Sequence, residues 1–439
     1  MSLASPAPAS SPRRAQRQAV VAAAVGSAIE WYDFFLYGVA AALVFPKVFF
    51  PASDPYTGVL LAFSTYFVGF LARPIGAAVF GHWGDRIGRK ATLVATLVLM
   101  GLSTVAIGLV PTHASLGVWA GALLVVLRLL QGIGVGGEWG GAVLLAMEWA
   151  DDSRRGLMAS WPQFGVAVGL VLANAALAFA AWWSGDQFLT WGWRVPFLLS
   201  VGLIGVGFWI RLGIQESPEF LRLQAQGQLE AQPVRTVLRE HGREVLLTAL
   251  ARSGQQAPFY VFTAFVLDYG TRILGQERQL MLNLVMLASC LMLVSVPFWA
   301  HLSDRIGRRR MMLLGSAAMV PFSFLYFGLL DTRDAGWMAL AIAVSLPVHD
   351  MQYGPQAAFI AESFPTHLRY SGASLGYQLA SITSGGPAPL LALWLFEATR
   401  SSVAIAAFMA LFAAVGFLAI LLLRPDASAP PHALGAARR

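Results

Sequence analysis

Two nearly identical ten-residue stretches divide the chain, and each follows a long apolar run. Residues 81–90 and 300–309 share His, Asp, Arg, Ile, Gly and Arg at the same offsets. A basic turn that contains glycine has to lie outside the hydrocarbon core of a bilayer. The duplication therefore predicts a membrane protein that is built from two related halves.

Composition requires most of this chain to face lipid. Of the 439 residues, 57% are hydrophobic and 12% are charged, whereas charged residues make up about a quarter of an ordinary soluble domain. A bilayer needs about 20 apolar residues per helix, and twelve such runs occur. They cover residues 19–44, 56–80, 91–110, 116–147, 158–183, 193–213, 245–268, 280–301, 311–330, 336–361, 370–396 and 401–423. We predict an all-α polytopic membrane protein with twelve transmembrane helices in two pseudo-symmetric six-helix bundles.

A polar segment in the middle of the chain separates six apolar runs from six. We expect an N-terminal tail at 1–18, an N-terminal bundle at 19–213, a linker at 214–244, a C-terminal bundle at 245–424 and a C-terminal tail at 425–439. Twenty-one of the thirty Lys and Arg residues fall on one side of this topology. Because cytoplasmic loops are rich in Lys and Arg, we predict a multi-pass protein of a bacterial-type plasma membrane with both termini cytoplasmic.

The basic character of the chain does not indicate nucleic-acid binding. The net charge is +7, but the basic residues are spread over loops that flank membrane spans rather than gathered on one soluble face. Cys290 stands alone, so no intrachain disulfide is expected. The chain has no spacing typical of a metal site, a nucleophile elbow or a phosphate loop, so we expect neither an enzyme nor a metal or cofactor.

Carboxylates inside the first and fourth predicted helices are candidates for proton coupling. An ionisable group at the bilayer centre costs at least about 2.5 kcal/mol, so it is rarely idle. Asp33 and Arg128 fall at similar depth, which predicts either a proton switch or a static ion pair. Glu30 lies three residues before Asp33 and shares its helix face. Glu138 is either a second proton site or a buried carboxylate that is hydrogen-bonded to a neighbouring helix.

A polar stripe on the seventh predicted helix indicates a substrate site. Arg252, Gln255, Gln256, Phe259 and Tyr260 occupy one face, which is untenable against lipid and must face a cavity or another helix. Arginine binds carboxylates through a planar two-pronged fork, so a small organic anion is the expected substrate. Further polar side chains that could line the same cavity are Tyr37, Gln163, Asn174, Gln352, Tyr353, Gln356, Tyr377 and Gln378.

Two other intramembrane sites have both structural and functional interpretations. His349 and Asp350 lie between Pro347 and Pro355, where broken helical hydrogen bonding is tolerated only beside a cavity or neighbouring helices. The pair could couple protons, contact substrate or serve structure alone. Arg73 is followed by a proline near the inner face, and we interpret it as a structural donor between helices.

Charged residues at the inner face repeat in both halves. Glu148 and Arg155 are seven residues apart, and together with Asp85 and Arg89 they form one predicted cytoplasmic gate. The equivalent set in the second half is Asp304, Arg308, Glu362 and Arg369. Paired charges of this kind can bias a two-state transporter, although they also determine topology.

Several of these motifs resemble the major facilitator superfamily. The repeated Asp85–Lys90 loop is similar to the signature loop of that superfamily, and Arg128–Gly136 is similar to its fourth-helix pattern, which the family links to proton coupling. The segments that resemble the metabolite:proton symporter branch are Glu30–Phe34, Gly136–Gly141, Gly192–Phe197, Glu362–Pro365 and Arg369–Gly372. The resemblance implies a central site between two bundles and rocker-switch alternating access.

Members of this branch carry either small carboxylates or zwitterionic osmolytes such as proline and betaine. We therefore predict a proton symporter that imports a mono-, di- or tricarboxylate, with the organic anion, protons and the lipid bilayer as partners and a monomer as the functional unit. A proton symporter of a zwitterionic osmolyte and a non-transporting receptor on the same fold are the alternatives. The osmolyte alternative is less favoured because no coiled-coil tail exists and intramembrane arginines are plentiful.

Overall fold

The computed structural model describes residues 12–51, 53 and 55–423, which form helices joined by short loops and turns, with no strand among these residues. Nine of the described helical segments are long and apolar enough to cross a membrane. They correspond to all the predicted spans except the second, seventh and tenth. Those three are α3 (Pro55–Ile87), the segment that starts with α12 (Gly242–Tyr260), and α16 (Ala335–Ala361). With the nine others these three make up the twelve predicted spans.

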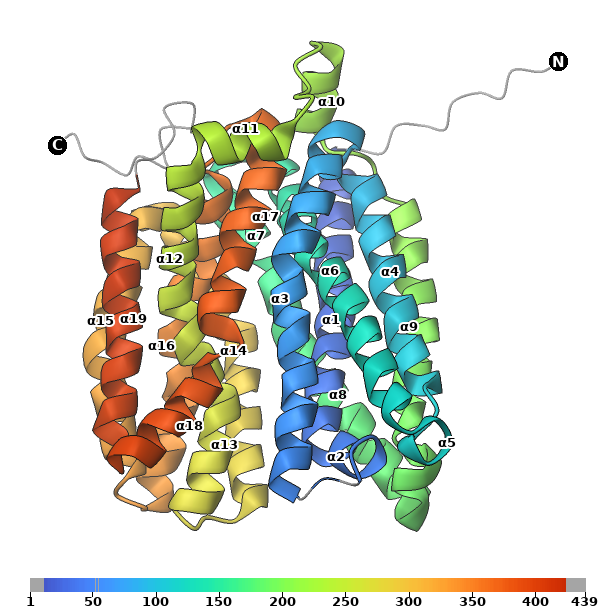
Figure 1. Ribbon diagram of the computed structural model, residues 1–439. Helices are drawn as coiled ribbons and strands as arrows, with labels where there is room; N and C mark the ends of the chain where they lie inside the picture. The colour runs from blue at the N-terminus through green and yellow to red at the C-terminus, as the bar shows by residue number, and fades with distance from the viewer. Residues whose placement is uncertain (1–11, 52, 54, 424–439) are drawn as a thin grey trace.

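The spans form two bundles that lie side by side (Figure 1). The helices of the N-terminal bundle are α1 (Pro12–Leu43), α3, α4 (Arg89–Leu109), α6 (Val118–Glu148), α8 (Trp161–Ser184) and α9 (Arg194–Leu212). Those of the C-terminal bundle are α12, α14 (Arg278–Ile306), α15 (Arg308–Leu330), α16, α17 (Arg369–Ala380) with α18 (Ala388–Thr399), and α19 (Ser402–Leu422).

The same helix neighbours occur in both bundles. In the first, α1 packs on α8, α3 on α6, and α4 on both α6 and α9. In the second, α12 packs on α17, α14 on α16, and α15 on both α16 and α19. The predicted pseudo-symmetry of the two halves is therefore confirmed in the packing of their helices.

Glycines allow α3 and α6 to approach closely. A Cβ at Gly132 would lie 2.3 Å from the carbonyl oxygen of Gly69, and one at Gly136 would lie 2.0 Å from that of Arg73. Small residues let helix backbones meet in a membrane, where burial from water does not drive helices together. The glycine-rich sequence of α6 thereby fixes the depth of Arg128 against α3.

Large apolar side chains cover the outside of the bundles. Trp182, Trp209, Trp394, Val294 and Leu109 each expose more than 60% of their surface. On a soluble protein a surface of this kind would be an aggregation hazard, whereas in a bilayer it meets lipid tails.

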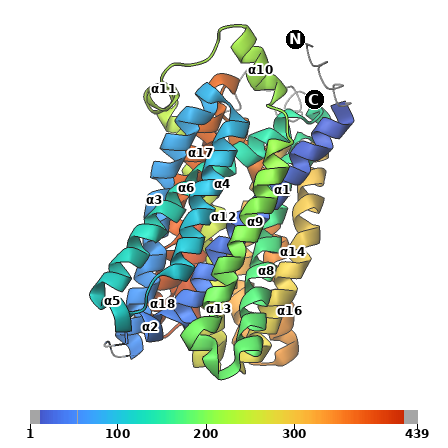
Figure 2. The same cartoon turned by 90° about the vertical axis from the view of Figure 1, so that its right-hand side faces the viewer.

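The predicted linker contains two short helices, α10 (Pro218–Ala225) and α11 (Pro233–Glu240). Ser217 caps α10 by accepting a hydrogen bond from the backbone N–H of Phe220 at 3.1 Å. Both helices lie at one end of the bundles, which we call the linker face (Figure 2). The predicted tail at 1–18 is helical from Pro12, while 1–11 and 425–439 lie outside the described residues.

Two spans of the C-terminal bundle are interrupted by π-helical turns. After α12 the chain continues through η4 (Val261–Phe265), α13 (Val266–Asp268) and η5 (Tyr269–Ile273). In the other span, η7 (Ser381–Gly385) separates α17 from α18. Such turns are frequent at functional sites, and η4 directly follows the polar stripe of α12.

Candidate transport site and gate

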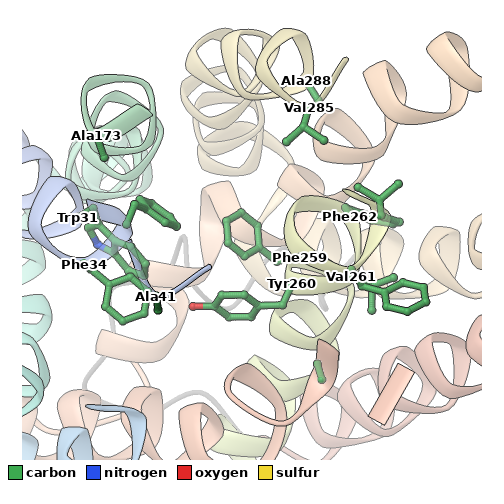
Figure 3. Packing of buried hydrophobic residues seen from close by; sticks show 14 of the residues in the cluster. Trp31, Phe34, Ala41, Ala173, Phe259, Tyr260, Val261, Phe262, Val285 and Ala288 are labelled. Atoms are coloured by element: carbon green, nitrogen blue, oxygen red, sulfur yellow. The ribbon is translucent and has the colours of Figure 1, made fainter. Parts of the chain in front are cut away.

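A small cavity of about 10 Å³, roughly the space that one water molecule occupies, lies between the two bundles. Its lining comes from α1 and α8 on one side and from α12 and α16 on the other. Figure 3 shows Tyr260 extending from α12 toward Trp31 and Phe34 of α1. The lining residues are Trp31, Val166, Arg252, Gln255, Phe259, Tyr260 and Tyr353. The predicted polar stripe therefore does face a central cavity, although Gln256 is not part of the lining.

Arg252 is the cationic group of the cavity wall, and it is buried. Its guanidinium donates to Gln255, to Gln356 at 2.9 Å and to the hydroxyl of Tyr377 at 2.7 Å. Its Cζ atom lies 4.0 Å from the centre of the Tyr377 ring. Its Nε–H has no partner, and none of the ion pairs among the described residues involves Arg252.

Two more buried guanidiniums lie among aromatic rings of the N-terminal bundle. The Cζ atom of Arg128 is 4.2 Å from the ring centre of Tyr37, and that of Arg73 is 4.3 Å from the ring centre of Phe34. In both arginines Nε and Nη2 lack hydrogen-bond partners. Arg73 also lies 5.5 Å from the ring of Trp31, which lines the cavity. The sequence did not predict that Arg73 lies among aromatic rings near the cavity.

The predicted ion pair between Asp33 and Arg128 is not formed. Asp33 accepts a hydrogen bond from Ser200 at 2.7 Å, and its second carboxylate oxygen has no partner. Arg128 instead donates to Gln131, which donates to Thr104 at 2.8 Å, and Thr104 lies beside Asp33. Gln131 and Thr104 thus lie between the two charged residues, but the Thr104 hydroxyl donates to the backbone carbonyl of Met100 at 3.0 Å.

Glu138 is paired with an arginine that sequence analysis did not single out. It accepts hydrogen bonds from Arg211 of α9 and, at 2.8 Å, from Thr96 of α4. This arrangement matches the interpretation of Glu138 as a buried carboxylate bonded to neighbouring helices. Glu30 is also buried, and the charges that act on it include Glu138, Arg73 and Arg211. Arg211 ends the sixth predicted span, where a basic residue suggests only an interfacial position.

A continuous chain of hydrogen bonds leads from Arg252 into the C-terminal bundle. Gln255 bonds to Nε2 of His349, and Nδ1 of His349 lies 2.8 Å from Asp350. Asp350 also accepts from Ser295 of α14. His349 and Asp350 are fully buried. The structure thereby brings the predicted His349–Asp350 pair into contact with the predicted substrate stripe.

The remaining predicted substrate residues divide into two groups. The first group, Gln163 and Tyr377, contacts the opposite bundle. Gln163 of α8 donates a hydrogen bond to the backbone carbonyl of Tyr353 in α16 at 2.6 Å, and the ring of Tyr377 stacks on that of Trp139 in α6 with 3.6 Å between ring centres. The others bond within their own bundle: Tyr37 to Thr65, Gln256 to Ser384, Gln352 to Ser316 and Gln378 to Ser381. None of this second group lines the cavity.

At the linker face, one predicted gate joins the N-terminal bundle to α17. Arg89 lies 3.5 Å from Asp85 and 3.5 Å from Glu148. Asp85 also accepts hydrogen bonds from the backbone N–H groups of Tyr370 at 3.3 Å and Ser371 at 2.9 Å, across the bundle interface. The carboxylate thus binds the positive N-terminal end of a helix in the other bundle.

The second predicted gate repeats this geometry with the bundles exchanged. Arg308 lies 3.0 Å from Asp304 and 2.8 Å from Glu362. Asp304 accepts from the backbone N–H groups of Gly156 at 2.8 Å and Leu157 at 2.9 Å in α7 (Arg155–Ala159). The two aspartates of the sequence repeat therefore hold the two bundles together in equivalent ways.

A glutamate of the linker, Glu219, joins both gates and was not predicted. Its carboxylate lies 2.8 Å from Arg155 of the N-terminal bundle and 3.0 Å from Arg369 of the C-terminal bundle. Nearby, Glu216 accepts from the backbone N–H of Arg89 at 3.0 Å. The Ser217–Pro218 pair predicts the start of a helix, but no local sequence signal reveals that Glu219 reaches two bundles.

A buried site between two six-helix bundles is the arrangement typical of a membrane transporter. The sequence profile described as Major Facilitator Superfamily matches residues 23–387. The chain belongs to this superfamily.

Relatives of this chain are bacterial transport proteins. It is 40% identical over 397 residues to the Shikimate transporter of Escherichia coli (strain K12), covering 89% of this chain and 90% of the relative. It is 38% identical over 417 residues to the Inner membrane metabolite transport protein YhjE of the same organism, covering 94% of each chain. It is 31% identical over 424 residues to the Proline/betaine transporter of that organism, covering 94% of this chain and 84% of the relative.

A solved structure with the same fold is the proton:xylose symporter XylE bound to 6-bromo-6-deoxy-D-glucose. The two structures superpose with a TM-score of 0.77 at 18% sequence identity, covering 97% of this chain and 99% of XylE. The match supports the twelve-helix fold of the superfamily.

Proposed function

We propose that the protein is a proton-coupled symporter that imports a small organic anion with at least one carboxylate. The observation that carries this proposal is the set of three buried arginines around the bundle interface, Arg73, Arg128 and Arg252, each with at least one unpartnered N–H. None of them takes part in an ion pair among the described residues. Buried charges need compensation, and an anionic substrate supplies it.

The side chains that line the cavity favour a small substrate with an apolar face. Trp31, Phe259, Tyr260 and Tyr353 provide rings on which a compact carbon skeleton can pack, and Arg252 provides the carboxylate contact. The name of the relative that transports shikimate supports a compound of this kind, a compact ring with one carboxylate. We assign Arg252, Gln255 and Tyr260 to substrate contact.

We assign proton binding in the N-terminal bundle to Asp33. Its carboxylate is buried, it has a single hydrogen-bond donor in Ser200, and its second oxygen is unpartnered. Gln131 and Thr104 lie between Arg128 and Asp33, and Arg128 has N–H groups without partners that could pair with the charged carboxylate during the cycle. Glu30 adds a second buried carboxylate on the same helix, whereas Glu138 serves as a fixed partner of Arg211.

We propose that the linker face is cytoplasmic and that its gates open and close as the bundles rock. The linker face carries both copies of the basic repeat, in agreement with the tendency of cytoplasmic loops to be basic. In this structure both gates are engaged. Release toward the cytoplasm requires Asp85 and Asp304 to leave the helix ends that they bind.

Counterflow in proteoliposomes tests the proposal. Vesicles are loaded with unlabelled shikimate, citrate, succinate, betaine or proline. One series of these vesicles is diluted into labelled shikimate, and a second, parallel series is diluted into labelled betaine. We expect exchange of labelled shikimate against at least one carboxylate and no exchange of labelled betaine. Exchange of zwitterions alone would support the osmolyte carrier, and the absence of any exchange would favour a non-transporting receptor.

A further inference from the structure

The hydrogen-bond chain behind Arg252 contains a titratable residue, His349, to which the proposed symport cycle has assigned no role. The chain runs from Arg252 through Gln255 and His349 to Asp350, and Ser295 closes its far end. Its first four members are at most 3% exposed. One end lines the cavity and the other lies between α14 and α16, so the chain connects the substrate site to the interior of the C-terminal bundle.

The direction of every hydrogen bond in this chain follows from Arg252. A guanidinium only donates, so the oxygen of the Gln255 amide must face Arg252 and its NH2 group must face His349. Nε2 of His349 therefore accepts, and Nδ1 carries the hydrogen that is donated to Asp350. The observed geometry requires a neutral His349 and an Arg252 that is engaged by Gln255.

Protonation of His349 is incompatible with this arrangement. A proton on Nε2 would place an N–H against the NH2 group of Gln255. Turning the amide over presents its oxygen to His349 but its NH2 group to Arg252, which then loses that acceptor. Arg252 retains Gln356 and Tyr377 as acceptors, and one N–H is freed at the cavity wall.

We propose that His349 is a second proton-binding site and that Gln255 transmits its protonation state to Arg252. The proton binds Nε2 and leaves from the same atom, and the resulting imidazolium is balanced by the carboxylate of Asp350. The freed N–H of Arg252 then binds the carboxylate of the substrate. Proton and anion therefore bind cooperatively, and each increases the affinity for the other by the same factor.

The charges around His349 act in the same direction. The charged groups that act on it are Asp350 of its own helix and Arg252 of α12. The other facing groups are the amide of Gln255 and the ring of Phe259 from α12, and the ring of Tyr353 from α16. On α14, Ser295 binds Asp350; on α15, Ser316 binds Gln352 instead. An anion that neutralises Arg252 removes a repulsion and favours the protonated imidazole.

The inference rests on the proposed function, and shikimate binding as a function of pH tests it. The probe is labelled shikimate, bound to the purified full-length protein between pH 6 and 8.5, where free carboxylic acids are ionised. If protonation promotes binding, the affinity of the wild type falls as pH rises, by at most about tenfold per pH unit for one proton. Two variants break the relay at different points, His349→Gln and Gln255→Met. We expect each to reduce this slope by at least half.

Matched variants separate the relay from other effects. Ser345→Ala removes a buried hydroxyl one turn earlier on α16, whose bond at 2.7 Å goes to the backbone of Ile342, and it should keep the wild-type slope. Asp33→Asn should retain the part of the slope that is due to His349. Wild-type slopes in both relay variants, with intact shikimate binding, would overturn the inference but not the proposed function. A wild type that neither binds nor exchanges any carboxylate would overturn both.

Discussion

The linker face follows the twofold repeat of the sequence, whereas the membrane interior does not. Asp85 and Asp304 occupy the same repeat position, and each accepts hydrogen bonds from two backbone N–H groups of the opposite bundle. In the interior, Arg128 lies twenty residues before Glu148, and the residue twenty before Glu362 is Ile342. The arginine that is essential to the proposed site therefore has an apolar counterpart.

The same contrast holds for Arg73. It lies twelve residues before Asp85, and the residue twelve before Asp304 is the buried Met292. Equivalent contacts at the linker face suit a motion in which two similar bodies rock against one another. In the interior, Arg73 and Arg128 have no charged counterparts, and they place two positive charges in the N-terminal bundle. Symmetry thus serves the movement, and its loss creates the binding site.

The largest effect should come from removing the positive charge of the cavity wall. Arg252→Gln removes a donor that contacts Gln255, Gln356 and Tyr377 and, in our proposal, the substrate carboxylate. Hydrogen bonds to charged groups contribute about 1.5–3 kcal/mol each, so we expect kcat/KM for shikimate uptake to fall about 100-fold. Arg235→Gln is the matched control, because Arg235 lies exposed on α11 and, within the described part of the chain, hydrogen-bonds to Gln232 at 3.1 Å. Uptake by Arg252→Gln within threefold of the wild type would contradict the assignment.

A smaller effect should separate proton coupling from substrate exchange. Asp33→Asn keeps an acceptor for Ser200 but cannot carry a proton. Each proton carried allows about tenfold further accumulation of the anion per unit of pH gradient, so with His349 still able to bind a proton we expect the variant to accumulate shikimate about tenfold less per pH unit than the wild type. Counterflow, which needs no net proton movement, should stay within about threefold of the wild type. Gradient-driven accumulation by the variant at the wild-type level would remove Asp33 from proton coupling.

The symmetric gates offer a matched pair of variants. Asp85→Asn and Asp304→Asn each weaken two hydrogen bonds across the interface from the charged to the neutral kind, which we expect to shift the equilibrium toward an open linker face about tenfold. A reporter is available in Ser374 of α17, which is buried against Gly140 of α6. Alkylation of Ser374→Cys, in a chain whose sole cysteine is replaced by Cys290→Ala, measures opening.

If the two aspartate variants accelerate alkylation of the reporter equally, within about threefold, the two gates contribute similar free energies to closure of the linker face. A large effect from one and none from the other would show that a single gate controls opening. The variant with only the reporter and Cys290→Ala sets the basal rate.

Sequence was sufficient to predict the features that depend on periodicity and repetition. Twelve spans and two bundles follow from apolar run lengths and from the duplicated loop, because membrane thickness and charge placement impose strong local rules. Of each predicted set of four gate residues, three lie together around Arg89 or Arg308, whereas Arg155 and Arg369 pair with Glu219. The polar stripe of α12 was also predicted, because a helix face with five polar or aromatic residues is unfavourable against lipid and has to face a cavity or another helix.

The pairing of interior charges could not be predicted because it depends on which helices meet. Asp33 and Arg128 share a depth, yet Ser200 and Gln131 are their partners. Arg211 looked like a residue of the membrane interface, but it pairs with Glu138. Glu219 lies in a polar segment without hydrophobic periodicity, and only its contacts with Arg155 and Arg369 reveal a role.

Glu219 gives the smallest predicted effect, because its carboxylate is partly exposed. Partly exposed ion pairs often contribute only about 0.2–0.5 kcal/mol each, so loss of both pairs in Glu219→Gln should accelerate alkylation of the Ser374→Cys reporter about two- to fivefold. The linker glutamate differs from the gates in being a single residue that binds both bundles at once. Glu219→Gln should therefore multiply the alkylation rate of the Asp85→Asn variant and that of the Asp304→Asn variant by the same factor.

Salt and a second linker glutamate sharpen this test. Screening at high ionic strength weakens exposed pairs more than buried ones, so the difference between Glu219→Gln and its parent should shrink as salt is raised. Glu230→Gln is the control, because Glu230 accepts a hydrogen bond from the backbone of Gln232 within the linker and contacts neither bundle through an ion pair among the described residues. If Glu230→Gln and Glu219→Gln accelerate alkylation equally, the effect arises from the net charge of the linker, and Glu219 does not act as a bridge between the two bundles.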